Sequence, residues 1–303
     1  MINLTSFILT HTTPGEITIT QLLDFLENAP NLQKVDLYSA TPTSSPQNGR
    51  LVSLTRLKWM YTIGGGPSSL LLDHLLIPVG AQLTTEVELP SPQVVDPPPR
   101  FLDNLRNLHN FTAIRLYGYE AYPHMRFSGP NGEVRMTLIN PRVNVTSLVL
   151  GSLSRFDTTK TEQLDIINGD PLSSNPLYYA LLLMKDLRTL TLCHCRSPHI
   201  FIRTLNPSMR PSGTMVSPKL EELVLELDLD REEFDIRSVI EMARSRALGG
   251  AKLRVVKIVD RNADPKVDSA DVLELRKHVR DVVDYQYLVD EEGQDVVSAA
   301  SSW

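Results

Sequence analysis

The chain has 303 residues, of which 42% are hydrophobic and 22% are charged, and its formal net charge is −6. This balance is typical of a folded globular protein and excludes a wholly disordered one. The negative net charge provides no general attraction to nucleic acid or to an anionic membrane surface, so we expect neither as a partner.

Nothing in the sequence directs the chain to the secretory pathway or into a membrane. The first residues have neither the charged leader nor the apolar stretch of a signal peptide. No window approaches the roughly 18 consecutive apolar residues of a membrane helix. Two cysteines, Cys193 and Cys195, are too few and too close together for a disulfide framework. We therefore expect a cytoplasmic or nuclear protein, or one found in both compartments.

A short apolar frame recurs along the chain. Asn3–Leu9, Asn110–Leu116 and Asn144–Leu150 share the order Asn, apolar, two variable residues, apolar, one variable residue, Leu. The underlying spacing, apolar-x-x-apolar-x-apolar, recurs at intervals near or above the leucine-rich-repeat period of about 20 to 29 residues. These frames are Leu4–Leu9, Leu32–Leu37, Leu54–Trp59, a weaker Thr84–Leu89, Phe111–Leu116, Val145–Leu150, Leu187–Leu192, Leu220–Leu225 and Leu253–Ile258. The alternation in the second half of each frame predicts a short strand with one buried face.

Helical patterns lie between several of these frames. The predicted helices span residues 20–28, with Thr20 as the N-cap, and then 67–76, 197–205, 236–248 and 268–283. Residues 125–139 predict a hairpin that turns at Gly129–Gly132. The fold we predict is α/β: an irregular leucine-rich-repeat-like solenoid with short parallel strands, outer helices and one hairpin insertion. We expect residues 1–289 to form this single domain and residues 290–303 to be a disordered tail.

Three stretches resemble the repeats of fungal, basidiomycete-type F-box proteins of the leucine-rich-repeat class. They are Leu22–Leu37, Leu70–Gly80 and Pro218–Leu225 together with the segments that follow it. The resemblance implies a protein-interaction module similar to the substrate-recognition region of ubiquitin-ligase receptors. Because the first frame begins at Asn3, we expect the F-box to be absent and the first repeat to lack a cap. A Skp-type adaptor is then expected as a partner only if an F-box lies upstream. The alternative is a free-standing repeat scaffold with no link to ubiquitin.

No pattern of residues indicates an enzyme, a cofactor or a metal site. Cys193, His194, Cys195 and His199 include zinc-ligand types, but neighbouring strand residues alternate faces, so Cys193 should point outward and Cys195 into the core. The glycine-rich stretch at residues 64–69 lacks the Lys-Ser/Thr ending of a phosphate-binding loop. The seven histidines are scattered, with no nucleophile motif nearby. We therefore expect no catalytic residues, no metal ligands and no bound cofactor.

The expected mechanism is recognition of a protein partner on the concave strand face. The residues between the buried strand positions would form that surface. We predict Tyr38, Arg115 and Tyr117 as its strongest contributors, because Tyr and Arg are frequent hot-spot types. The full predicted set is Lys34, Asp36, Tyr38, Arg56, Lys58, Arg115, Tyr117, Glu222, Glu226 and Lys257.

Overall fold

The computed structural model describes most of the chain between residues 3 and 286. The described residues are 3–10, 16–38, 49–63, 71–88, 111–118, 124–130, 132–139, 150, 153, 158–169, 174–195, 197–209, 213–227, 234–260 and 269–286. The predicted tail at 290–303 and the glycine-rich stretch at 64–69 lie outside these residues.

An open, twelve-stranded sheet organises the fold, with the strand order β1-β2-β4-β6-β9-β8-β7-β10-β11-β12-β13-β14. Its strands are β1 Ser6–Thr10, β2 Lys34–Tyr38, β4 Trp59–Ile63, β6 Gln82–Glu88, β7 Ala113–Tyr117, β8 His124–Gly129, β9 Gly132–Ile139, β10 Gln163–Ile167, β11 Thr189–Cys193, β12 Glu222–Leu227, β13 Val255–Asp260 and β14 Asp281–Gln286. Two short strands, β3 Val52–Ser53 and β5 Leu75–Leu76, pair separately. Among the described pairings, β8 is antiparallel to both neighbours and all others are parallel.

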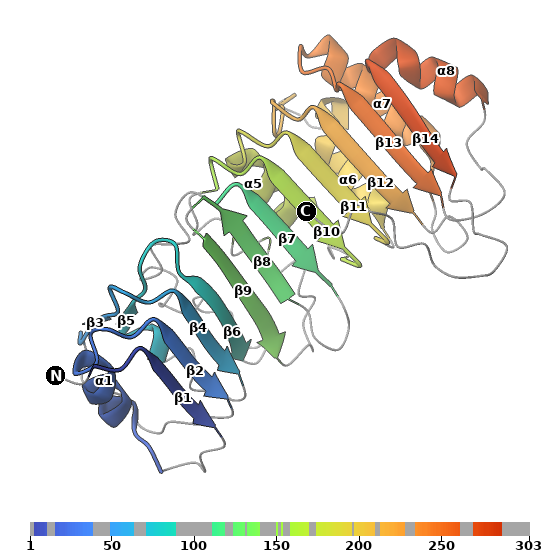
Figure 1. The fold of residues 1–303 in the computed structure, drawn as a ribbon. Coiled ribbons are helices and arrows are strands. Elements are labelled where there is room, and N and C mark those ends of the chain that lie inside the picture. Colours follow the sequence, from blue (N-terminus) through green and yellow to red (C-terminus); the bar gives the residue numbers. More distant parts are fainter. Residues whose placement is uncertain are drawn as a thin grey trace, which may run out of the picture.

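The helices cover one face of this sheet. They are α1 Ile19–Glu27, α5 Ser174–Leu183, α6 Pro198–Leu205, α7 Ile236–Leu248 and α8 Ser269–His278, with a 3₁₀ turn at Pro207–Met209. Figure 1 shows the strands following one another along the long direction of the sheet, with α5 to α8 behind β10 to β14. The chain therefore has a mixed α/β fold with a large, mostly parallel sheet. No helix in the described part of the chain is long and apolar enough to cross a membrane.

Alternation along each strand builds the core. In β2, Val35 and Leu37 are buried while Lys34, Asp36 and Tyr38 lie on the other face. The same pattern places Leu190 and Leu192 of β11 inside, against the helix layer. Each buried Leu or Val contributes about 2 kcal/mol through removal of apolar area from water. The apolar frames therefore predicted these inward positions correctly.

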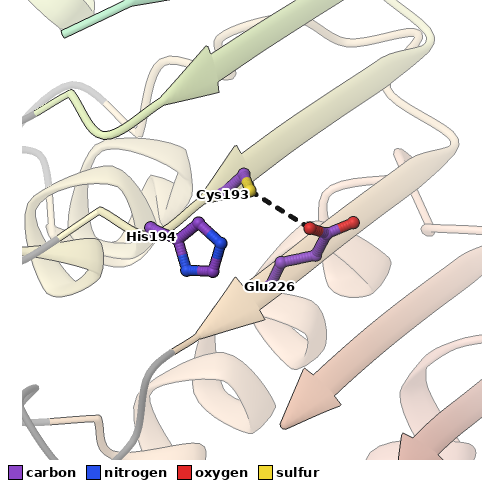
Figure 2. A group of neighbouring side chains, drawn as sticks. All are labelled: Cys193, His194 and Glu226. Carbon is purple, nitrogen blue, oxygen red and sulfur yellow. Dashed lines mark hydrogen bonds between the residues drawn. The ribbon is translucent and has the colours of Figure 1, made fainter. Parts of the chain in front are cut away.

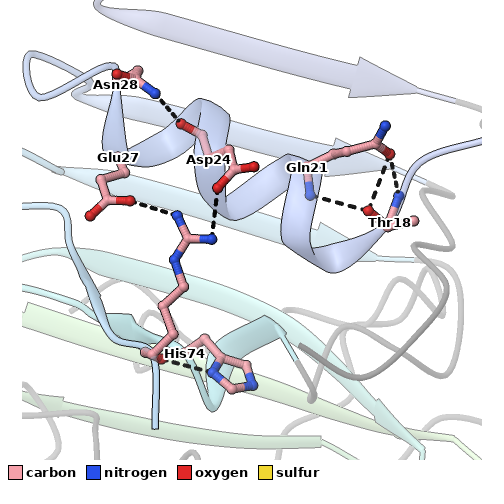
Figure 3. Close-up of polar contacts among 7 residues, drawn as sticks. Thr18, Gln21, Asp24, Glu27, Asn28 and His74 are labelled. Atoms are coloured by element: carbon pink, nitrogen blue, oxygen red, sulfur yellow. Dashed lines mark hydrogen bonds and ion pairs between the residues drawn. The ribbon is translucent and has the colours of Figure 1, made fainter. Parts of the chain in front are cut away.

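The N-cap of helix α1 lies two residues earlier than predicted. Thr18, not Thr20, is the N-cap: its Oγ1 accepts from the Gln21 backbone N–H at 3.1 Å, and Gln21 Oε1 accepts from the Thr18 N–H at 2.9 Å (Figure 3). This reciprocal pair is a capping box. Arg50 then ties the helix to the strand layer through ion pairs with Asp24 at 2.7 Å and Glu27 at 2.5 Å.

The predicted hairpin exists, but it is part of the main sheet rather than an insertion beside it. β8 and β9 pair antiparallel up to Gly129 opposite Gly132. β9 also pairs with β6, and β8 pairs with β7. Gly132 has φ +111°, and a Cβ there would lie 2.9 Å from the Ala81 carbonyl oxygen, so both the turn and the close approach favour glycine.

Two predicted frames are out of register with their strands. In β4 the inward residues are Met60 and Thr62, so Trp59 faces outward and the frame Leu54–Trp59 is wrong. In β6 the inward residues are Leu83 and Thr85, so the frame at Thr84–Leu89 is also displaced. The reason is a buried hydroxyl pair, in which Thr62 Oγ1 donates to Thr85 Oγ1 at 2.8 Å. Thr85 Oγ1 in turn donates to the Glu86 carbonyl at 3.3 Å. Because both hydroxyls are hydrogen-bonded, two threonines occupy core positions that an apolar search cannot find.

Other expectations fail where helical and strand spacings coincide. Leu150 is buried and helical, and β7 pairs directly with β10, so the frame ending at Leu150 adds no strand between them. The helix predicted over 67–76 gives way to strand β5 at Leu75–Leu76. The helix predicted over 268–283 ends at His278, and Asp281–Gln286 forms β14 instead. Strand β10 and helix α5 were not predicted.

Candidate interaction face

The face of the sheet opposite the helices carries most of the residues predicted to bind a partner. Eight of the ten occupy outward strand positions there: Lys34, Asp36, Tyr38, Arg115, Tyr117, Glu222, Glu226 and Lys257. Their role in binding stays a prediction. Tyr38, with 42% of its surface exposed, is the most exposed of the three leading candidates, since Arg115 and Tyr117 are partly buried.

Arg56 and Lys58 are not strand residues of this face, so their predicted positions are wrong. Both are exposed and precede β4. The residues aligned with Lys34 and Asp36 are Trp59 and Tyr61. The error follows from the displaced frame, since a shift in register changes which side chains face outward.

Three arginines lie side by side at the centre of the face. Arg115 of β7 is directly opposite Arg126 of β8, and Arg126 is opposite Arg135 of β9. Like charges in direct cross-strand register destabilise a sheet. Two carboxylates offset this: Asp165 Oδ2 lies 2.9 Å from both Nε and Nη2 of Arg115, and Glu133 Oε2 lies 2.6 Å from Nη2 of Arg126.

The Arg115–Asp165 pair is less exposed than the Arg126–Glu133 pair. The Asp165 side chain is only 7% exposed and also accepts from Gln163 Nε2 at 2.9 Å. Desolvation lowers the pKa of Arg115, but hydrogen bonds to Tyr117 and Asp165 outweigh it and leave that pKa above its ordinary value. Arg115 is thus held in place, while the exposed Arg126 and Arg135 present their guanidinium groups to solvent.

Two aromatic pairs lie near the arginine row, one on β7 and β8 themselves and the other on β4, beyond β6. Tyr117 and His124 stack with ring centroids 4.0 Å apart, and Trp59 and Tyr61 stack at 5.7 Å. Lys34 Nζ lies 4.8 Å from the Trp59 ring centroid, within range of a cation–π contact. Desolvation, with smaller contributions from Asp36 and Glu86, raises the pKa of Tyr61, so its hydroxyl stays protonated at neutral pH. We call Trp59, Tyr61, Arg115, Tyr117, His124, Arg126 and Arg135 the aromatic–arginine face.

The predicted residues nearer the C-terminal end of the sheet form contacts between neighbouring strands. Glu222 pairs with Lys257 at 2.5 Å and with Arg254 at 3.5 Å. Glu226 Oε2 accepts a hydrogen bond from Cys193 Sγ at 3.1 Å. As predicted, Cys193 faces outward while Cys195 is fully buried. The strand ends at Cys193 and His194 has a φ of +51°, so the alternation does not continue to Cys195. Potential metal-ligand atoms of Cys193, His194 and Glu226 all lie within 4.8 Å of one another.

The sequence contained a signal for part of the arginine row. Pairing of Gly129 with Gly132 in the predicted hairpin places Arg126 opposite Arg135. The position of Arg115 beside them depends on β7 pairing antiparallel with β8, which no local pattern specifies. Asp165 lies on β10, in a stretch without a recognisable frame.

The aromatic–arginine face therefore combines two aromatic stacks with three guanidinium groups in one continuous area of sheet. Arg, Tyr and Trp are the residue types enriched at protein interfaces. A comparison of the chain with protein-family models, with curated proteins and with solved structures found no match.

Proposed function

We propose that the chain is a non-catalytic protein-interaction module that binds an acidic segment of a protein partner on the aromatic–arginine face. The architecture we propose for it is a leucine-rich-repeat-like solenoid, supported by the succession of parallel strands and covering helices. The observation that carries the binding proposal is the row Arg115, Arg126 and Arg135 on adjacent strands.

The spacing of the row suits an extended acidic peptide. Adjacent strands lie about 4.8 Å apart, so the outer two arginines are separated by about 10 Å at the backbone. Carboxylates on alternate residues of an extended peptide are about 7 Å apart, within reach of two flexible guanidinium groups. Guanidinium groups bind carboxylates through paired, charge-assisted hydrogen bonds. Because Arg126 and Arg135 are exposed, their guanidinium groups remain accessible to an added anion.

The aromatic stacks would supply contact area beside the charges. Trp59 and Tyr61 lie beyond β6, and Tyr117 and His124 lie at the ends of β7 and β8. Planar side chains lose little conformational entropy on binding and bury a large area. A partner segment with acidic residues flanked by apolar ones would match both features.

Binding of a fluorescein-labelled peptide of alternating glutamate and glycine with a terminal leucine tests the proposal. We expect an anisotropy change that weakens with added salt. Replacing both Arg126 and Arg135 by glutamine should weaken binding by about tenfold per lost charge-assisted contact. The matched control is the double variant Arg188→Gln and Arg237→Gln, which removes the same charge from exposed positions elsewhere. Equal affinity in the two double variants, or no binding by the wild type, would contradict the proposal.

The resemblance to F-box repeat proteins supports a narrower version, in which the module recognises substrates for a ubiquitin ligase. The alternative is a scaffold with no such link. Affinity purification of the chain, followed by mass spectrometry, separates the two. Co-purification of a Skp-type adaptor and a cullin favours the ligase role, and stable partners without either favour the scaffold.

A further inference from the structure

The geometry points to a Zn²⁺ site formed by Cys193, His194 and Glu226 on the outward side of β11 and β12, with a water molecule as the fourth ligand. The site goes beyond the proposed partner binding and is independent of it. It lies outside the aromatic–arginine face, two strands past Arg115 in the sheet.

Strand register brings two of the ligands together. Cys193 and Glu226 are direct neighbours on the parallel strands β11 and β12, so both side chains leave the same face. Cys193 Sγ donates to Glu226 Oε2 at 3.1 Å (Figure 2). Tetrahedral zinc with ordinary Zn–S and Zn–O lengths requires these atoms to be about 3.5 Å apart. A small rotation of the Glu226 carboxylate therefore makes room for the ion between Sγ and Oε2, in the place of the thiol proton.

A left-handed backbone conformation adds the third ligand. Consecutive residues of a regular strand point to opposite faces, which would carry His194 away from Cys193. At His194 the strand has ended and φ is +51°, so the imidazole lies beside the thiol, as Figure 2 shows. The His194 backbone N–H donates to the Glu226 carbonyl at 2.8 Å, which fixes this turn against β12.

The neighbouring strand provides an internal comparison. Asn168, directly after β10, has nearly the same φ, +52°, and its N–H donates to the Cys193 carbonyl at 2.8 Å. That turn therefore has the same backbone arrangement, but its strand ends in Ile167 and its turn residue is an amide. The backbone conformation belongs to the fold, whereas the three ligand types coincide at the β11–β12 turn.

The ligand chemistry and surroundings fit zinc. Thiolate, imidazole and carboxylate are its usual ligands, and three protein ligands leave one position open. All three residues are partly buried, so the ion can enter while some of its hydration is replaced by protein. Ile167 and the buried Val259 flank Cys193 and Glu226 in the same row of the face, which lowers the local polarity. Binding releases the Cys193 thiol proton to solvent, and the thiolate then bonds the ion.

The test uses the full chain after removal of metals by chelator and dialysis. We expect one Zn²⁺ per chain in competition with a chromophoric chelator, and tetrahedral Co²⁺ spectra with a thiolate charge-transfer band. Cys193→Ser, His194→Asn and Glu226→Gln should each weaken Zn²⁺ binding by roughly a hundredfold or more. Asparagine is chosen at position 194 because it occupies the equivalent left-handed position at 168. The matched controls, His199→Asn and Glu222→Gln, should bind as the wild type does.

Two results would overturn the site. One is a wild-type chain that takes up no stoichiometric Zn²⁺, and the other is binding that all three ligand variants retain. Thermal unfolding shows whether each variant is folded. Added Zn²⁺ should raise the unfolding midpoint of the wild type and of both controls, and should leave the midpoint of each folded ligand variant unchanged.

Discussion

Replacing Arg246 by alanine is expected to lower the free energy of unfolding by about 4 kcal/mol, combining a cavity with lost charge-assisted hydrogen bonds. Arg246 lies in α7 and is fully buried. Its Nη1 donates to the Val216 carbonyl at 3.0 Å and its Nη2 to the Ser217 carbonyl at 2.9 Å. Truncation would remove the Arg246 donor from both carbonyls and empty the volume of a long side chain. The Ser217 carbonyl would keep its hydrogen bond from the Leu220 N–H at 3.0 Å.

The charge of Arg246 is part of this effect. Burial lowers its pKa to about 10, which still leaves the guanidinium protonated at neutral pH. Its Nε has no hydrogen-bond partner among the described residues, so the two carbonyl contacts carry the stabilisation of a desolvated cation. Because the pKa of Arg246 is lower in the folded chain than in the unfolded chain, the unfolded chain binds the proton more tightly. The free energy of unfolding of the wild type should therefore increase as pH rises above about 10.

Urea unfolding at neutral pH measures the effect, with two companion variants. Arg246→Met keeps much of the volume and removes the buried charge, so it should lose about half as much stability as alanine does. Arg237→Ala, at an exposed position of the same helix, should change the free energy by no more than about 0.5 kcal/mol. If Arg246→Ala is as stable as Arg237→Ala, the two carbonyl contacts do not hold the helix to the segment before β12.

The buried arginine also shows what helical periodicity can and cannot predict. It lies seven residues after Val239 and three after Ala243, so helical spacing places it on the buried stripe of the helix predicted over 236–248. Its charge argued against that position, because charged residues are seldom buried without a partner. The partners are backbone carbonyls from a distant turn, and no spacing in the sequence indicates them.

Strands whose inward positions are apolar could be predicted, and those that use other chemistry could not. The frames at Leu32–Leu37, Leu187–Leu192 and Leu253–Ile258 correspond to β2, β11 and β13. The register of β4 and β6 could not be predicted, because the burial of Thr62 depends on its hydrogen bond to Thr85. Leu150 shows the opposite error, since a spacing of three residues between apolar side chains suits a helix as well as the start of a frame.

The candidate sites depend on contacts between strands and so lay beyond the local pattern. Cys193 and Glu226 are 33 residues apart in sequence, and their contact requires the register of β11 against β12. His194 was expected on the opposite face from Cys193, and the left-handed φ reverses that expectation. The arginine row likewise needed the pairing of β7 with β8.

The last prediction concerns Gly118, where an added methyl group should destabilise the centre of the sheet. A Cβ at this position would lie 2.2 Å from the Asn168 carbonyl oxygen and 2.8 Å from the Gly169 Cα. Both obstacles are backbone, so relief requires separating β7 from the end of β10. That movement stretches the hydrogen bond from the Gly118 N–H to the Ile167 carbonyl, now 2.8 Å. We expect Gly118→Ala to cost about 3 kcal/mol of unfolding free energy.

Gly249→Ala is the matched control, because there the nearest atom to an added Cβ is the terminal methyl carbon of Met215, at 2.7 Å. A flexible side chain can move aside, and Gly249 has an ordinary φ of −80° at the end of α7, so the change should stay within about 1 kcal/mol. Gly118→Ala should also weaken binding of the acidic peptide, since Arg115 and Tyr117 lie on the displaced strand, whereas Gly249→Ala should leave it unchanged. Equal stability of the two alanine variants in urea would show that β7 and β10 do not approach as closely as the geometry requires.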